Sequence, residues 1–212
     1  LVTMVWWSEL WLNESFATWL SYVAVHEIFP HLDINNYYFC DNYITALKMD
    51  SIKNSHPVEA NINDPSLISE IFDTITYSKG SSVIKMLVDY VGLNDFKKSI
   101  QLYIKKYKYK NTIAQNLWDC VSMVTNKNIN LMMENWISKK NFPLVSIKPH
   151  HNNILISQQP FTDINKTIWT IPLSNNYILN KQQTIMNKHD FYNNVHNNLF
   201  GFYIIKYDDT ML

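Results

Sequence analysis

The chain has 212 residues, enough to bury one sizeable hydrophobic core or one core with a smaller second domain. Eighteen lysines balance 18 acidic residues, arginine is absent, and the lysines are scattered except over residues 105–110, so the charge pattern excludes a nucleic-acid-binding face. No apolar run approaches the length of about 20 residues that a membrane span needs, and the N-terminus lacks a signal-peptide pattern.

The two cysteines, Cys40 and Cys120, are isolated and lack C-x-x-C spacing. This arrangement argues against a disulfide framework and favours a reducing compartment, so we expect a cytoplasmic protein, with a secreted or membrane-anchored ectodomain as the alternative. Leu1 is not an initiator methionine, and we therefore expect further sequence upstream of it.

The first predicted element is a helix from Leu10 to about Phe29, which Pro30 ends. Large apolar residues occupy most of its faces, so we expect a buried helix. Glu14 lies within this apolar segment, and a buried carboxylate needs a hydrogen-bonded partner, a cation or a metal. A lysine partner and the capping of a neighbouring helix end are the ordinary alternatives.

Further amphipathic helices are predicted downstream. One apolar stripe runs through residues 83–91 and stops at Gly92, and a second runs through residues 96–107. Thr112 and Gln115 form a capping-box pattern ahead of a third helix, and a last helical run ends in residues 136–141.

After Pro143 the pattern changes to short strands. Apolar and β-branched residues gather around 154–156, 168–171 and 202–205, separated by Asn, Asp and Pro. The sequence therefore predicts a helical part followed by a small all-β part.

The segment around Glu14 carries a family resemblance. Residues 6–17 read W-W-S-E-L-W-L-N-E-S-F-A, and this resembles the W-W-x-x-L-W-L-N-E-G-F-A segment of the gluzincin aminopeptidases, the family of aminopeptidase N and puromycin-sensitive aminopeptidase. The resemblance implies that Glu14 is the third protein ligand of a catalytic Zn²⁺, with Ser15 where glycine is usual. The other two ligands belong to an H-E-x-x-H motif, which this chain lacks and which we expect upstream of Leu1.

A second segment resembles the same family. Residues 69–87 are similar to its F-x-x-I-x-Y-x-K-G-A-x-V-x-x-M-L pattern, which implies that Tyr77 is the catalytic tyrosine. A phenol with a reference pKa of about 10 stays protonated at neutral pH and can donate a hydrogen bond to an oxyanion. Phe72 corresponds to an aromatic that lines the substrate cleft, with a core position as the alternative. We assign Lys79 to structure, and Gly80 to a close approach of backbones.

Three later segments extend the resemblance, with two departures. Residues 141–145, 169–173 and 201–203 match the family, but Asn141 replaces a glycine and Ile204 replaces an arginine. Asn tolerates the left-handed conformation that such a glycine can serve.

The histidines of this chain are not predicted to bind metal. His26 and His31 are five apart, which places them on different faces of a helix, and Pro30 breaks that helix. His150 and His151 read as exposed loop residues, and His56 lies in a segment that matches the puromycin-sensitive relatives without a metal role.

The resemblance implies an α+β chain. Residues 1–143 are expected to form the C-terminal helical part of a thermolysin-like catalytic domain, and residues 144–212 a small β-sandwich domain. The implied function is that of an internal fragment of a zinc aminopeptidase, which removes N-terminal residues from peptide substrates. The isolated chain is predicted to be inactive, since Glu14 alone provides too few ligands. The alternative is a non-catalytic homologue that acts as an interaction module.

Overall fold

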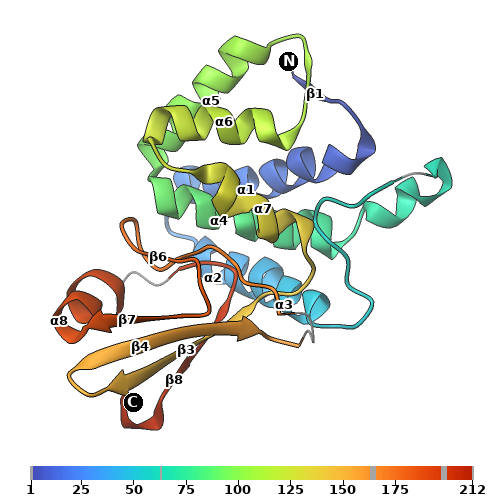
Figure 1. Cartoon of the computed structure of the whole chain (residues 1–212). Helices are drawn as coiled ribbons and strands as arrows, with labels where there is room; N and C mark the ends of the chain where they lie inside the picture. Colours follow the sequence, from blue (N-terminus) through green and yellow to red (C-terminus); the bar gives the residue numbers. More distant parts are fainter. Residues whose placement is uncertain (1, 63, 163–165, 197–199, 212) are drawn as a thin grey trace.

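The computed structural model describes residues 2–62, 64–162, 166–196 and 200–211, arranged as helices and short sheets (Figure 1). The helices are α1 (Leu10–Ile28), α2 (Ile34–Tyr38), α3 (Thr45–Asp50), α4 (Gly80–Val91), α5 (Leu93–Tyr107), α6 (Ala114–Thr125), α7 (Ile129–Ser138) and α8 (Lys188–Asp190). Short helical turns are η1 (Trp7–Glu9), η2 (Phe39–Ile44), η3 (Pro65–Ile71), η4 (Ile75–Lys79), η5 (Phe191–Val195) and η7 (Asp209–Met211).

The strands are β1 (Thr3–Met4), β2 (Asn111–Thr112), β3 (Pro143–His150), β4 (Asn153–Pro160), β5 (Ile171–Pro172), β6 (Ile178–Leu179), β7 (Gln183–Asn187) and β8 (Ile204–Tyr207). A four-stranded sheet has the order β7-β4-β3-β8, in which β3 runs antiparallel to β4 and parallel to β8. Two-stranded pairs join β1 to β2 and β5 to β6. The α+β class expected from the sequence is confirmed.

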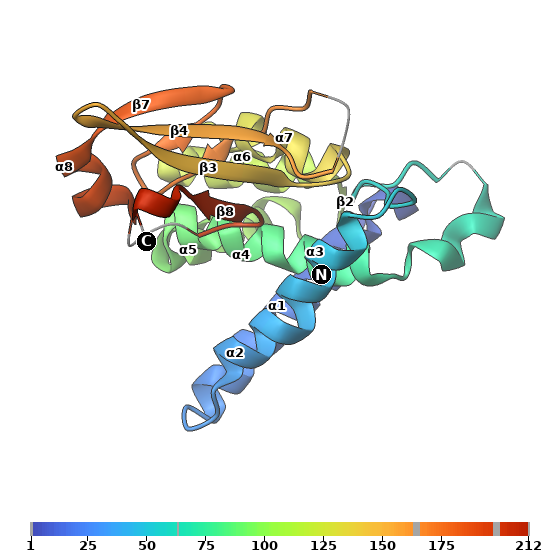
Figure 2. The same ribbon diagram turned by 90° about the horizontal axis from the view of Figure 1, so that it is seen from below.

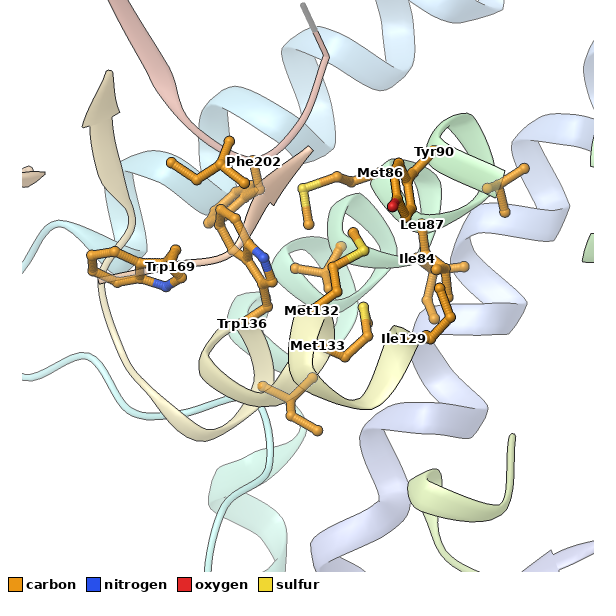
Figure 3. Packing of buried hydrophobic residues seen from close by; sticks show 14 of the residues in the cluster. Ile84, Met86, Leu87, Tyr90, Ile129, Met132, Met133, Trp136, Trp169 and Phe202 are labelled. Carbon is orange, nitrogen blue, oxygen red and sulfur yellow. The ribbon is translucent and has the colours of Figure 1, made fainter. Parts of the chain in front are cut away.

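One hydrophobic cluster joins the helices to the sheet. Alternate residues of β3 and β4 are buried, as period-2 strand geometry requires when one face covers a core: Val145, Ile147, Ile154 and Ile156. Figure 3 shows Met132 and Met133 of α7 beside residues of α4. The Trp136 and Trp169 rings lie 6.1 Å apart, which links α7 to the C-terminal part of the chain.

The expectation of a wholly buried first helix is wrong. Trp11 and Trp19 are buried, but Leu20 and Ile28 farther along α1 are 53% and 66% exposed. Figure 2 shows the reason: α1 and α2 lie side by side and project away from the rest of the molecule. Apolar residues on all faces indicate that a helix packs against other elements, but they do not show that this chain contains those elements.

The boundaries of two later helices also differ from the expected ones. α6 begins at Ala114, and its expected N-cap residue, Thr112, instead bonds its hydroxyl to that of Tyr103 at 2.6 Å. The N-cap residue is Ile113, whose backbone amide donates to Oδ1 of Asn116 at 3.1 Å. Oε2 of Glu9, distant in the sequence, accepts the Ala114 amide at 2.9 Å. α7 ends at Ser138, before the expected 136–141 terminus is complete.

The C-terminal part is not all-β. Residues 154–156 lie in β4 as expected, but of 168–171 only Ile171 is in a strand, and β8 begins at Ile204 rather than 202. α8 and η5 interrupt the strands. Phe191 and Val195 are both fully buried and four residues apart, which is the spacing of one helical face.

Among the described residues, no helix combines the length and the apolar character that crossing a bilayer requires.

Candidate active site

Glu14 and Tyr77, the two residues singled out by the family motifs, lie next to each other. Glu14 is partly buried in the first half of α1, and Tyr77 is partly buried in η4. The Tyr77 pKa is raised by burial and, in addition, by a hydrogen-bond and charge interaction with the Glu14 carboxylate. The phenol therefore keeps its proton at neutral pH and can serve as a hydrogen-bond donor.

Ser15 connects the helix of Glu14 to the turn of Tyr77. Its side chain is fully buried, and its hydroxyl donates to the carbonyl of Thr76 at 2.8 Å. That carbonyl belongs to the peptide group whose nitrogen is that of Tyr77. α1 and η4 are thus bonded together at the residues next to Glu14 and Tyr77.

Gly80 makes this close approach possible. A Cβ atom at Gly80 would lie 1.9 Å from Oγ of Ser15, so a side chain at this position would collide with the serine that bonds Thr76. The expectation that Gly80 serves backbone approach agrees with this geometry. Ser15, which stands at the glycine of the family motif, occupies the space that Gly80 leaves open.

Asp73 caps the turn that carries Tyr77. Oδ1 of Asp73 accepts the backbone amides of Ile75 and Thr76, each at 3.0 Å, and its carbonyl accepts the Tyr77 amide at 3.0 Å. η4 is a π-helical turn that continues directly into α4. Such turns occur often at functional sites, and here the cap fixes where the turn begins.

His56 hydrogen-bonds the other carboxylate oxygen of Asp73, Oδ2. Its Nε2 lies 2.8 Å from Oδ2 of Asp73, and its Nδ1 lies 2.7 Å from the Pro57 carbonyl. The hydrogen bond to Asp73 is the main reason why the His56 pKa is raised, against the opposing effect of burial. Burial alone would raise the pKa of Asp73, but hydrogen bonds from His56 and Thr76 outweigh it and lower that pKa. Both ring nitrogens of His56 face protein oxygens, so neither is free for a metal.

A buried ion pair also supports this turn, at its last residue, Lys79. Nζ of Lys79 lies 2.8 Å from Oδ2 of Asp50, and both side chains are fully buried. The ammonium also donates to the carbonyls of Lys139 and Asn141, at 3.0 and 3.3 Å. Burial lowers the Lys79 pKa, and the charge of Asp50 opposes this shift.

Asn141 completes this network. Its backbone amide donates to Oδ1 of Asp50 at 2.8 Å. Its φ of 71° is the left-handed conformation that asparagine tolerates and glycine adopts freely. Lys79 has the structural role expected from the sequence, because it ties the turn of Tyr77 to the junction between α7 and β3.

Phe72 lies on the surface near the start of η4. Its side chain is 45% exposed, and its ring contacts that of Trp7 edge-on, with centroids 6.4 Å apart. Trp7 is itself 38% exposed, so the two rings form an accessible aromatic surface and not part of the core.

Comparison with known proteins identifies the family. Residues 1–136, which include Glu14, Phe72 and Tyr77, match the peptidase family M1 domain. The chain belongs to peptidase family M1. This agrees with the resemblance to gluzincin aminopeptidases, and M1 members are hydrolases that are generally zinc-dependent.

Relatives of this M1 chain include named aminopeptidases. It is 37% identical to Tricorn protease-interacting factor F2 of Thermoplasma volcanium over 99% of the chain, and 35% identical to aminopeptidase M1-D of Oryza sativa subsp. japonica over its whole length. It is also 35% identical to the alanine/arginine aminopeptidase of Saccharomyces cerevisiae over 99% of the chain. The chain spans 28%, 27% and 26% of the lengths of these relatives.

The part of this M1 chain that the structure describes contains no cluster of three or more His, Cys, Asp or Glu side chains that could hold a metal ion. Besides His56, four histidines were considered from the sequence, and all four are exposed. His26 and His31 lie at the far end of the α1–α2 projection, and His150 and His151 lie where β3 ends and turns toward β4. In the same described part, Glu14 forms no ion pair, so the lysine partner considered as an alternative is not found there.

Sequence reasoning missed several residues that organise this M1 site. Asp73 had a usable signal, since an aspartate just before a helical run is a common N-cap. The bonds from Ser15 to Thr76 and from His56 to Asp73 had none, because 61 and 17 residues separate the partners in the sequence. Asp50 likewise has no local pattern that reveals its pairing with Lys79.

Proposed function

We propose that this chain is the part of a zinc metalloaminopeptidase that provides one metal ligand, Glu14, and one oxyanion donor, Tyr77. The observation that supports this most strongly is the hydrogen bond from the Ser15 hydroxyl to the Thr76 carbonyl at 2.8 Å, which joins the helix of Glu14 to the turn of Tyr77. The two family motifs are distant in sequence but lie close together in the fold, and the M1 match covers both.

The residues present fit part of a zinc site. A carboxylate oxygen is an accepted zinc ligand, and Glu14 is partly accessible and bears no described cationic partner. A catalytic zinc site has three protein ligands, of which this chain provides one. The other two, and the general base, come in our proposal from an H-E-x-x-H segment outside this chain; we call the polypeptide that contains both the parent protein.

When bound, zinc would supply Lewis-acid polarisation of the substrate carbonyl and an activated water. The contribution of this chain is positional. Tyr77 donates a hydrogen bond to the carbonyl oxygen of the substrate as negative charge develops on it, and the raised pKa keeps that donor protonated. Glu14 holds its carboxylate beside the donor, on a helix fixed to the same turn by Ser15.

The proposed substrates are peptides with a free N-terminus. Phe72, exposed and in contact with Trp7, would line the substrate cleft and offer an apolar surface to substrate side chains. The names of the relatives support an exopeptidase over other gluzincin activities.

We also propose the domain division expected from the sequence. Residues 1–143 would form the C-terminal part of a thermolysin-like catalytic domain, and residues 144–212 a β-sandwich domain. The change from helices to strands at Pro143 and the presence of two separate sheets after it support this division. A cytoplasmic location is proposed from the two free thiols, Cys40 and Cys120.

The test compares the parent protein with the 212-residue chain. We expect the parent protein to hydrolyse an aminoacyl chromogenic substrate in a chelator-sensitive manner, and the isolated chain to show neither turnover nor stoichiometric zinc after dialysis. Zinc-dependent turnover by the pure chain would overturn this division of the site. A parent protein that folds but lacks the H-E-x-x-H motif and all turnover would instead favour an interaction module.

A further inference from the structure

The two hydrogen bonds of His56 require a particular protonation state. Nε2 faces a carboxylate oxygen of Asp73 and Nδ1 faces the carbonyl oxygen of Pro57, at 2.8 and 2.7 Å. Neither oxygen has a hydrogen to give, whereas a neutral imidazole has one N–H group. Both bonds exist together only when both ring nitrogens are protonated, so the geometry around His56 fits the imidazolium form.

Two charged groups act on this imidazolium. Asp73 stabilises it, and the ammonium of Lys79 in η4 opposes it. Lys79 is itself paired with Asp50 at 2.8 Å, which weakens its repulsion of His56. The side chains of His56 and Asp73 are 31% and 32% exposed, so the proton can exchange with solvent.

Asp73 links His56 to the turn of Tyr77 through hydrogen bonds on both of its carboxylate oxygens. One carboxylate oxygen bonds His56, and the other accepts the amides of Ile75 and Thr76. A carboxylate is a stronger cap for these amides when its charge is held in place by a hydrogen-bonded cation. Deprotonation of His56 removes one N–H, so the ring must release either Asp73 or Pro57.

We propose that His56 is a positioning residue for Tyr77: its imidazolium fixes Asp73, Asp73 fixes the start of η4, and loss of the proton loosens the turn that presents the Tyr77 hydroxyl. The proposal defines an ionisation that limits activity as pH rises through the His56 pKa and that belongs neither to the tyrosine nor to the metal site. Its catalytic consequence rests on the proposed function, but the link between His56 and the turn does not.

The direction of the pH effect follows from the shifts. The His56 pKa is raised in the folded protein, so its stabilising contribution is complete below the unfolded pKa of about 6.5 and is lost as pH rises through the folded value. The Asp73 pKa is lowered, so its contribution is lost only as pH falls through that value. Between these limits, both groups are charged and the turn is held.

The link is tested in the 212-residue chain by NMR. The imidazole Cε1–H signal of each histidine is followed with pH, and the His56 signal is assigned by its loss in His56→Gln; amide protection factors of Ile75, Thr76 and Tyr77 are measured over the same range. We expect the pKa of His56 to lie above the ordinary histidine value of about 6.5, and the protection of the three amides to fall along the His56 titration curve. His150→Gln, which removes an exposed histidine, should leave both observations unchanged.

Asp73→Asn separates charge from capping. The Asn amide oxygen can still accept backbone amides, but it no longer pairs with a cation, so we expect the His56 pKa to return toward its ordinary value. The inference is overturned if wild-type His56 titrates at or below the ordinary value, or if amide protection at residues 75–77 does not follow its titration.

The catalytic consequence is tested in the parent protein. We expect His56→Gln to lower kcat about 10- to 100-fold below the His56 pKa, with a nearly unchanged KM, and to lack the fall in kcat that we expect of wild type as pH rises through that pKa. An alkaline limb identical in wild type and variant would overturn the positioning role. Absence of turnover in a zinc-loaded wild-type parent would contradict the proposed function, while the NMR result would still decide the link between His56 and the turn.

Discussion

Tyr77→Phe in the zinc-loaded parent protein should lower kcat by about 10²- to 10³-fold, the loss typical of removing one oxyanion donor. The substitution deletes one hydroxyl and keeps the ring, so the packing of η4 is preserved. The effect is large because the lost hydroxyl is a positioned donor to the developing oxyanion. The phenol is protonated at neutral pH in any case, and its raised pKa extends that protonation to higher pH. Turnover of an aminoacyl chromogenic substrate measures the effect.

Tyr109→Phe is the matched control. Tyr109 is 83% exposed, far from both motif segments in sequence, and loses the same atom. We expect its kcat to equal that of wild type. If Tyr77→Phe and Tyr109→Phe have the same kcat, Tyr77 has no part in stabilising the oxyanion.

Lys79→Met should reduce the free energy of unfolding by about 3–5 kcal/mol, the usual cost of removing one partner from a buried ion pair. Methionine nearly preserves the length of the side chain but leaves Asp50 as an uncompensated charge in a fully buried site. The carbonyls of Lys139 and Asn141 lose their donor as well. Urea denaturation of the 212-residue chain, followed by far-UV circular dichroism, measures the change.

Lys98→Met provides the comparison at a solvated pair. Lys98 pairs with Asp95 at 2.8 Å, but their side chains are 65% and 42% exposed. Exposed pairs contribute at most about 1 kcal/mol, so we expect a small change. Equal effects of the two substitutions would show that burial of the Lys79–Asp50 pair has no special importance for stability.

The sequence was most informative where a local pattern determines a local structure. The stripe through residues 83–91 predicted α4, and Gly92 ends it with a φ of 86°, a conformation in which glycine is free of strain. Glu14 and Tyr77 were found by motif, because the family resemblance preserves the residue types that the chemistry needs. The structure adds that Ser15 bonds the helix of Glu14 to the turn of Tyr77.

What the sequence did not reveal depends on long-range partners. The Thr112 pattern predicted the wrong N-cap of α6, since Ile113 holds that position, and no local pattern reveals that Glu9, 105 residues away, accepts the Ala114 amide. Lys79 is charged yet fully buried, and only the three-dimensional fold brings Asp50 to it. Hydrophobicity likewise predicted that all of α1 is covered, whereas Ile28 lies on the exposed projection.

The zinc content of the parent protein after dialysis tests most directly whether Glu14 is a metal ligand. The comparison uses wild type, Glu14→Ala and Tyr77→Phe; alanine suits the helix interior, so the fold should persist without the carboxylate. We predict stoichiometric zinc in wild type and in Tyr77→Phe, and loss of zinc from Glu14→Ala. Stoichiometric zinc in a folded Glu14→Ala protein would contradict the account.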